Sequence, residues 1–267
     1  MEKAVILAAG RGSRMRQTQH STTLTASQAE LARTGMKAMM PVGRPFIDYF
    51  LASLADAGFR QICLIVGPDH DAMRRHCAGY TSGRLNIRFI VQPSAQGTAN
   101  AVACAAPFVG DDPFLVINAD NYYPATALTG LRQASGAAVA AFHPAGLGQG
   151  NISPERLRHF AVLLPGLDGT LERVVEKPNE AFFSNATHPI LVSMNCWRFT
   201  PEIFAACRSI PLSPRNEYEL TDAVTYAIHT LREKFQIVKV NEPVLDLTSQ
   251  SDIPEVTRRL AAYKVNL

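Results

Sequence analysis

The chain has 267 residues, 47% of them hydrophobic and 18% charged, which suits one large domain with a sizeable buried core. Its formal net charge of +3, with no run of Lys or Arg, gives no support for a nucleic acid or a membrane surface as a partner. The five cysteines are scattered and lack C-x-x-C spacing, so we expect reduced thiols in the core of a cytoplasmic protein.

The first half of the chain predicts alternating strands and helices. Its first apolar run, residues 3–8, is too short for a signal peptide or a membrane span and predicts a strand. Further strands are predicted at 60–66, 86–91, 113–118 and 137–142, and helices at 45–57, 69–77, 98–106 and 124–134. Nearly continuous apolar strands separated by helices favour a Rossmann-like α/β fold, with a mostly parallel central sheet and helices on both faces.

The second half, from about residue 151, has a different pattern. Strands are predicted at 160–164, 171–175 and 190–199 with fewer helices between them, which indicates a small β subregion. Helices follow at 201–209 and 220–231, then a strand at 235–240 and a last helix at 254–263. Because there is no linker and no internal repeat, we predict a single domain over residues 1–267.

A glycine-rich turn follows the first strand, between Leu7 and Arg14. Without side chains at Gly10 and Gly12, backbone N–H groups can approach a phosphate or a nucleotide closely. The turn is not a Walker loop, which would end in Lys-Ser or Lys-Thr, and the third glycine of a dinucleotide fingerprint would fall at Met15. An ordinary glycine turn with Arg14 on the surface is the alternative.

Residues 17–36 form a long polar segment rich in Thr, Ser and Gln, which ends next to Lys37. We predict that this segment is a flap that orders over a bound triphosphate, and a static surface excursion is the alternative. Lys37 lies at the edge of an apolar run and offers a compact positive charge suited to a triphosphate. Taken alone, it would be an ordinary solvated lysine.

Three polar side chains stand at the ends of later predicted strands. Gln92 carries an amide that could read the hydrogen-bonding edge of a base. Asp120 follows the strand at 113–118, and ligands of open α/β sheets bind at this carboxyl end, where a carboxylate is a natural Mg²⁺ ligand. Asp246 lies in an apolar strand end and therefore needs a partner, which a metal would provide.

Together these motifs resemble the sugar-1-phosphate nucleotidyltransferases, including the glucose-1-phosphate uridylyl- and thymidylyltransferases. The resemblance covers essentially the whole chain, and it is the joint order of individually weak motifs that is specific. It implies an Mg²⁺-dependent enzyme that joins a nucleoside triphosphate to a sugar 1-phosphate and releases pyrophosphate. The motifs are Gly10-x-Gly12-x-Arg14, Lys37, Gln92, Gly97-Thr98, Asp120, Glu176-Lys177-Pro178, Glu217, Leu220-Thr221-Asp222 and Val244-Leu245-Asp246.

The resemblance also implies roles, with residues 1–150 as the nucleotide-binding half and residues 151–267 as the sugar-phosphate-binding half. Gln92 before Gly97-Thr98 favours UTP or dTTP, and Ser193-Met194 favours a glucose-like sugar. The sequence leaves oligomeric state open, with a homo-oligomer among the options. The implied roles are catalytic for Arg14 and Lys37; nucleotide-binding for Leu7, Ala9, Gly10, Gly12, Gln92, Gly97 and Thr98; metal-binding for Asp120 and Asp246; and sugar-phosphate-binding for Glu176, Lys177 and Ser193.

The sequence departs from the family pattern in three places. Lys37 comes 23 positions after Arg14, later than is usual, so residues 17–36 resemble an insertion beside the triphosphate. Phe160-Ala161-Val162 stands where Tyr-Gly-Val is common, and Asn195 stands where glycine is usual. The alternative function is that of a catalytically silent nucleotide-sugar-binding regulatory subunit. Such a protein would be expected to lose the charged positions that this chain retains.

Overall fold

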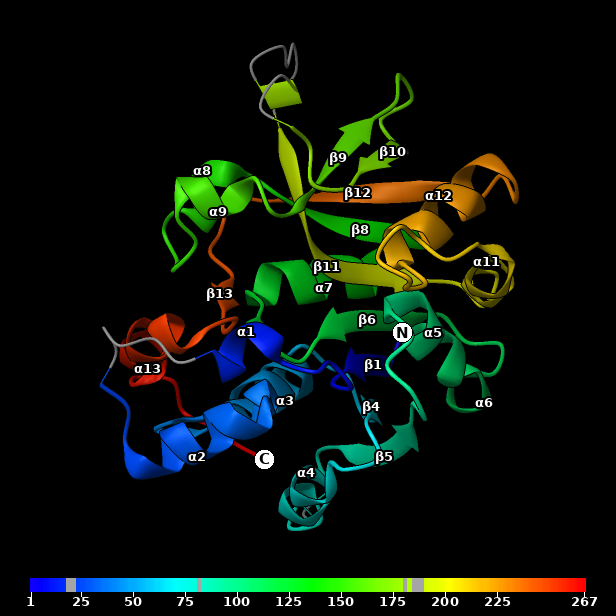
Figure 1. The fold of residues 1–267 in the computed structure, drawn as a ribbon. Coiled ribbons are helices and arrows are strands. Elements are labelled where there is room, and N and C mark those ends of the chain that lie inside the picture. Colours follow the sequence, from blue (N-terminus) through cyan, green and yellow to red (C-terminus); the bar gives the residue numbers. More distant parts are fainter. Residues whose placement is uncertain (18–22, 81–82, 180–181, 184–189) are drawn as a thin grey trace.

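The computed structural model shows a nine-stranded sheet whose first part is parallel (Figure 1). In this part β1 lies between β4 and β6, and β5 forms the edge beyond β4; all three pairings are parallel. The strands are β1 (Lys3–Leu7), β4 (Gln61–Val66), β5 (Asn86–Val91) and β6 (Phe114–Asn118). The structure describes residues 1–17, 23–80, 83–179, 182–183 and 190–267.

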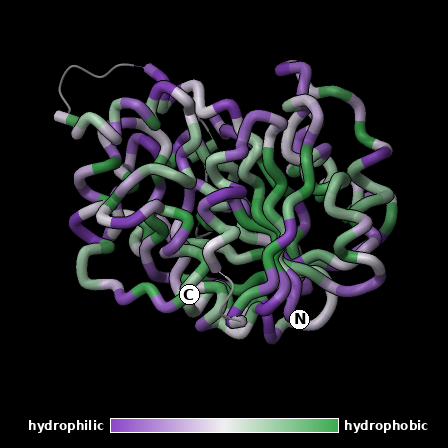
Figure 2. Tube along the Cα trace, turned by 90° about the horizontal axis from the view of Figure 1, so that it is seen from below, coloured by the Kyte–Doolittle hydropathy of each residue, from purple (hydrophilic) through white to green (hydrophobic). Residues whose placement is uncertain are grey.

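Helices cover both faces of this sheet because its strands are apolar on both sides. Ala4 and Ile6 of β1 belong to one buried cluster, and Val5, which points the other way, belongs to a second. The first cluster includes residues of α3 (Phe46–Asp56), α4 (Asp71–Cys77), α7 (Ala125–Gln133) and α13 (Ile253–Leu260). The second includes residues of α5 (Thr98–Cys104), α6 (Ala106–Val109), α11 (Ile203–Ser209) and α12 (Leu220–His229). Figure 2 shows hydrophobic strands in the middle of the molecule with helical turns on either side, and this arrangement confirms the predicted α/β class.

The second half extends the sheet through one long antiparallel strand, β11 (Leu191–Phe199). Its last residues pair with β6 and its first residues with β9, while β8 runs along its other side. The register shifts between Ser193 and Trp197, and Asn195 within that stretch has φ 53°. Asparagine tolerates this left-handed conformation better than most residues, which explains why it can stand where glycine is usual. The remaining strands are β8 (Ala137–Phe142), β9 (Ala161–Pro165), β10 (Leu171–Val175) and β12 (Phe235–Val240).

Part of the polar segment at 17–36 is a helix, α2 (Ala26–Thr34), which the sequence analysis did not predict. Thr25 and Gln28 form a capping box: Gln28 N–H donates to Thr25 Oγ1 (3.3 Å), and Thr25 N–H donates to Gln28 Oε1 (3.0 Å). The helix ends at Gly35, whose φ is 75°. Residues 18–22 of the predicted flap lie outside the described residues, and ordering over a nucleotide stays a prediction.

Several further short elements were not predicted because they are too short to show a hydrophobic period. None of the helices in the described part of the chain is long and apolar enough to cross a membrane. All five cysteines are free thiols, and only Cys104 is not fully buried. The short elements are α1 (Ser13–Arg16), η1 (Lys37–Met39), β2 (Pro41–Val42), β3 (Arg44–Pro45), β7 (Asn121–Tyr122), α8 (Pro144–Leu147), α9 (Pro154–Leu157), β13 (Leu245–Asp246) and η2 (Gln250–Asp252).

Candidate active site

A cavity of about 320 Å³ opens at the carboxyl ends of β1, β5 and β6. This is the edge at which open α/β sheets bind their ligands. The cavity brings together residues that the sequence analysis had selected from four separate segments. The selected residues that line it are Leu7, Ala9, Gly10, Gly12, Lys37, Gln92, Gly97, Thr98 and Asp120.

The glycine-rich turn is packed against the end of the polar segment, backbone to backbone. A Cβ atom on Gly12, whose φ is 59°, would lie 2.2 Å from the carbonyl oxygen of Gly35. A Cβ atom on Gly35 would in turn lie 2.5 Å from the carbonyl oxygen of Arg11. Arg16 Nη2 closes the contact by donating to the carbonyl oxygen of Thr34 (2.8 Å). Both positions therefore require glycine, and Gly35 and Met36 form part of the cavity wall.

The arginines of this turn differ in their relation to the cavity. Arg14 is exposed on the one-turn helix α1 and is not among the residues that line the cavity. Arg11, which the sequence analysis passed over, does line it. Arg11 lies between the two glycines of the motif, and that position was the signal that could have identified it.

Lys37 and Asp120 form an ion pair inside the cavity. Lys37 Nζ lies 2.8 Å from Asp120 Oδ2, and both side chains are largely shielded from solvent, with exposed fractions of 14% and 27%. Lys37 begins η1, directly after the polar segment, and Asp120 follows β6. A cation and an anion held together at the end of the sheet can each serve a charged ligand, Lys37 a phosphate and Asp120 a metal ion.

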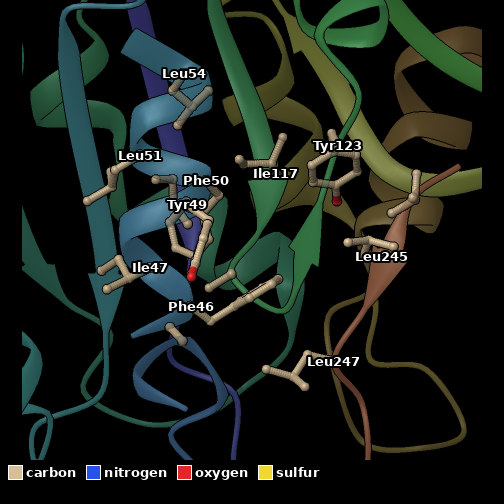
Figure 3. Close-up of a cluster of buried hydrophobic side chains, with 14 of the residues drawn as sticks. Phe46, Ile47, Tyr49, Phe50, Leu51, Leu54, Ile117, Tyr123, Leu245 and Leu247 are labelled. Atoms are coloured by element: carbon tan, nitrogen blue, oxygen red, sulfur yellow. The ribbon is translucent and has the colours of Figure 1, made fainter. Parts of the chain in front are cut away.

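Asp246 is brought beside Asp120 by a two-residue ladder. β13 pairs with β7 so that Asp246 is opposite Asn121, and Leu247 N–H donates to the carbonyl oxygen of Asp120 (2.8 Å). Leu245 and Leu247, on either side of Asp246, are buried in the same cluster as Phe46 and Ile117 (Figure 3). Anchoring both neighbours in the core fixes the position of this carboxylate.

The environment of the Asp246 carboxylate combines burial with charges of both signs. Its side chain is only 4% exposed, Oδ2 lies 3.2 Å from Arg156 Nη2, and Oδ1 has no hydrogen-bond partner in the described part of the chain. Burial, and next the nearby Asp120 carboxylate, raise the pKa of Asp246 to about 6, while Arg156 opposes the rise. Arg156 also contacts Asp252 Oδ1 at 2.5 Å. The sequence analysis missed Arg156, because only the fold brings it to Asp246.

The predicted sugar-phosphate residues do not line the cavity. Glu176 and Lys177 follow β10, and Lys177 has a positive φ of 43°. Arg215 Nη2 lies 3.5 Å from Glu176 Oε1, and burial raises the pKa of Glu176 while Arg215 opposes the rise. Ser193 lies on β11 with only 4% of its surface exposed, and its Oγ accepts a bond from Asn195 N–H (3.3 Å). The structure therefore leaves these three residues as a prediction.

Glu217 lines the cavity although the sequence analysis gave it no role. Its segment is docked onto the loop before α5: Tyr218 N–H donates to the carbonyl oxygen of Gln96 (2.8 Å), and Leu220 N–H donates to Thr98 Oγ1 (2.9 Å). A Cβ atom on Gly97 would lie 2.4 Å from the carbonyl oxygen of Tyr218. Close approach at Gly97 thus carries Glu217 to the cavity wall.

Comparison with known proteins places these features in context. A family model described as nucleotidyl transferase matches residues 3–261. The low-salt glycan biosynthesis nucleotidyltransferase Agl11 of Haloferax volcanii is 30% identical over 226 residues, which cover 83% of this chain and 56% of that protein. The UTP–glucose-1-phosphate uridylyltransferase AglF of the same organism is 27% identical over 97% of this chain and 96% of its own length.

One further curated protein and one solved structure are also similar to this chain. The glucose-1-phosphate thymidylyltransferase of Streptomyces antibioticus is 29% identical, and the match covers 85% of this chain and 57% of that protein. Among solved structures, a UDP-glucose pyrophosphorylase complexed with UDP-glucose superposes with a TM-score of 0.74, covering 99% of this chain and 100% of that chain. At 19% identity this last match is a likeness of fold.

Proposed function

The chain belongs to the nucleotidyl transferase family, and from that premise we propose that it joins UTP or dTTP to a glucose-like sugar 1-phosphate and releases pyrophosphate. The observation that carries the proposal is the shared cavity, which holds the glycine-rich turn, Lys37, Gln92 and Asp120 at the carboxyl ends of three strands. In this proposal residues 1–150 bind the nucleotide and residues 151–267 bind the sugar phosphate, through Glu176 and Lys177.

The reaction needs no nucleophile from the protein. An oxygen of the sugar phosphate attacks the α-phosphorus of the nucleotide, a new P–O bond forms, and the bond from that phosphorus to the bridging oxygen breaks as pyrophosphate leaves. A phosphate oxygen is already ionised at neutral pH, so a general base is not required. The protein contributes position and charge. When the nucleotide binds, the Lys37 ammonium group leaves the Asp120 carboxylate and binds a phosphate oxygen instead. Arg14 and Lys37 then neutralise the negative charge of the departing pyrophosphate.

The two aspartates suit a magnesium ion. Asp246 Oδ1 is buried without a partner in the described part of the chain, and burial, followed by the nearby Asp120 carboxylate, raises the pKa of Asp246. Asp120 and Asp246 would hold Mg²⁺, which when bound would supply positive charge to the α-phosphate. No group of three or more His, Cys, Asp or Glu side chains in the described residues could hold a metal, and phosphate oxygens and water would complete the coordination of an ion held by these two aspartates.

A single assay of pyrophosphate release tests this proposal. The protein is incubated with Mg²⁺, each of the common nucleoside triphosphates and a panel of sugar 1-phosphates. We expect turnover with UTP or dTTP and a glucose-like sugar 1-phosphate, and none when Mg²⁺ is removed. A clear preference for ATP or GTP would contradict the proposal that UTP or dTTP is the nucleotide donor. Nucleotide-sugar binding without turnover under every condition would identify a silent regulatory subunit instead.

A further inference from the structure

The side-chain amide of Gln92 is held in one orientation by the protein. Gln92 is 3% exposed, follows β5 and lines the cavity. Its Nε2 donates two hydrogen bonds, one to the carbonyl oxygen of Gly97 (3.1 Å) and one to Asn100 Oδ1 (2.8 Å). A backbone carbonyl can only accept, so the atom beside Gly97 must be the NH₂ group of the glutamine. That group has two hydrogens, and both are used.

Asn100 completes this arrangement from behind the cavity wall. It lies in the first turn of α5 and is not among the residues that line the cavity. With Nε2 of Gln92 fixed by Gly97, Asn100 must turn its own oxygen toward it, because two NH₂ groups cannot bond to each other. The consequence is that Gln92 Oε1, which accepts no hydrogen bond from the described residues, is the only amide atom left for a ligand.

We propose that Asn100 is a positioning residue: together with the carbonyl oxygen of Gly97 it holds the NH₂ group of Gln92, directs the oxygen of Gln92 toward the base and so selects uracil or thymine against cytosine. The inference rests on the proposed function, in which Gln92 meets the base. Uracil and cytosine have the same size and shape, but N3 of uracil carries a hydrogen and N3 of cytosine carries a lone pair. In this proposal Gln92 Oε1 lies at N3 of the base, where a fixed acceptor bonds to uracil and faces an unpaired acceptor in cytosine, a mismatch that is costly in a buried site.

Two variants of nearly equal size separate this role from simple packing. Asn100→Asp keeps an acceptor for Gln92, whereas Asn100→Leu removes it and leaves one hydrogen of the buried NH₂ group without a partner. The measured quantity is the ratio of kcat/KM for UTP to kcat/KM for CTP, together with the ratio of the two equilibrium affinities in the absence of sugar 1-phosphate. For the unmodified protein we expect UTP to be favoured by about a hundredfold.

We expect the UTP-to-CTP ratio of Asn100→Asp to stay within about threefold of that of the unmodified protein. We expect the ratio of Asn100→Leu to be lower by at least about tenfold. An equal loss for UTP and CTP in Asn100→Leu would mean a purely structural role and would overturn the inference. The inference would also be overturned if both variants kept the UTP-to-CTP ratio or if both lost it. It would be overturned as well if the unmodified protein used UTP and CTP equally well. Preferential binding of UTP that depends on Asn100, without any turnover, would support the inference and refute only the proposed enzymatic activity.

Discussion

Replacing Gly12 by alanine adds one methyl group where the glycine-rich turn touches Gly35. The new Cβ atom would lie 2.2 Å from the carbonyl oxygen of Gly35 and 2.7 Å from its Cα, and both neighbours are backbone atoms that cannot rotate away. The two segments must therefore move apart by roughly 1 Å to restore ordinary contact distances. In addition, a left-handed backbone conformation costs a residue with a side chain about 1–2 kcal/mol.

The displacement matters for catalysis because the turn and residues 35–37 both line the cavity. A misplacement of about 1 Å can lower turnover by about a hundredfold. Gly136 provides a matched control, since its φ of 64° is nearly that of Gly12, and a Cβ atom there would meet nothing within 4 Å. Gly136→Ala should thus share the conformational cost and lack the collision.

Urea unfolding and the pyrophosphate-release assay measure the two effects separately. We expect Gly136→Ala to lose about 1–2 kcal/mol of stability and to keep its turnover. We expect Gly12→Ala to lose at least as much stability and, while still folded, about a hundredfold of kcat/KM. If Gly12→Ala turned over as fast as Gly136→Ala, the close contact with Gly35 would be unimportant and the reasoning would be refuted.

Three further predictions concern other parts of the molecule. Asp246→Asn should fold normally and lose at least about a hundredfold in turnover, and near-normal turnover with unchanged Mg²⁺ dependence would make Asp246 a structural carboxylate. Burial raises the pKa of Glu233, so the Glu233 carboxyl group binds a proton more tightly in the native state than in the unfolded chain. The free energy of unfolding therefore falls as the pH rises through this raised pKa and the buried group becomes charged. Glu233→Gln should therefore gain stability over the unmodified protein at about pH 8 but not at about pH 4, and parallel pH curves would contradict this. Asn195 has φ 53°, so Asn195→Val should be less stable than Asn195→Gly by about 1–2 kcal/mol in urea unfolding, and equal stabilities would count against strain at this bulge.

The sheet could be predicted from the sequence because β1, β4, β6 and β8 are nearly continuous apolar runs that are buried on both faces. The predicted ends of β5, β8, β10 and β12 agree with the structure residue by residue. Helix α2 could not be found by hydrophobic period, since only Ala32 of its nine residues is buried. Its capping box at Thr25 and Gln28 was the signal present in the sequence.

The candidate site was predictable where a residue follows directly from a strand end. Gln92 and Asp120 both line the cavity because parallel strands end at the same edge of the sheet. The contacts of Gln92 with Asn100 and of Asp246 with Arg156 were not predictable, because only the fold brings α5 and α9 to these side chains. β7 and β13, with two residues each, are too short to show any pattern.

The pairing of β13 with β7 has a consequence for the order in which the protein is made. The described residues that line the cavity, Glu217 included, all precede Asp246 in the chain. During synthesis from the N-terminus the cavity wall is therefore translated before the second of the two carboxylates that we assign to the metal. A nascent chain that ends before Asp246 already carries the residues that line the cavity and lacks one of these two carboxylates. On this assignment, both metal ligands are present only after the cavity wall has been translated.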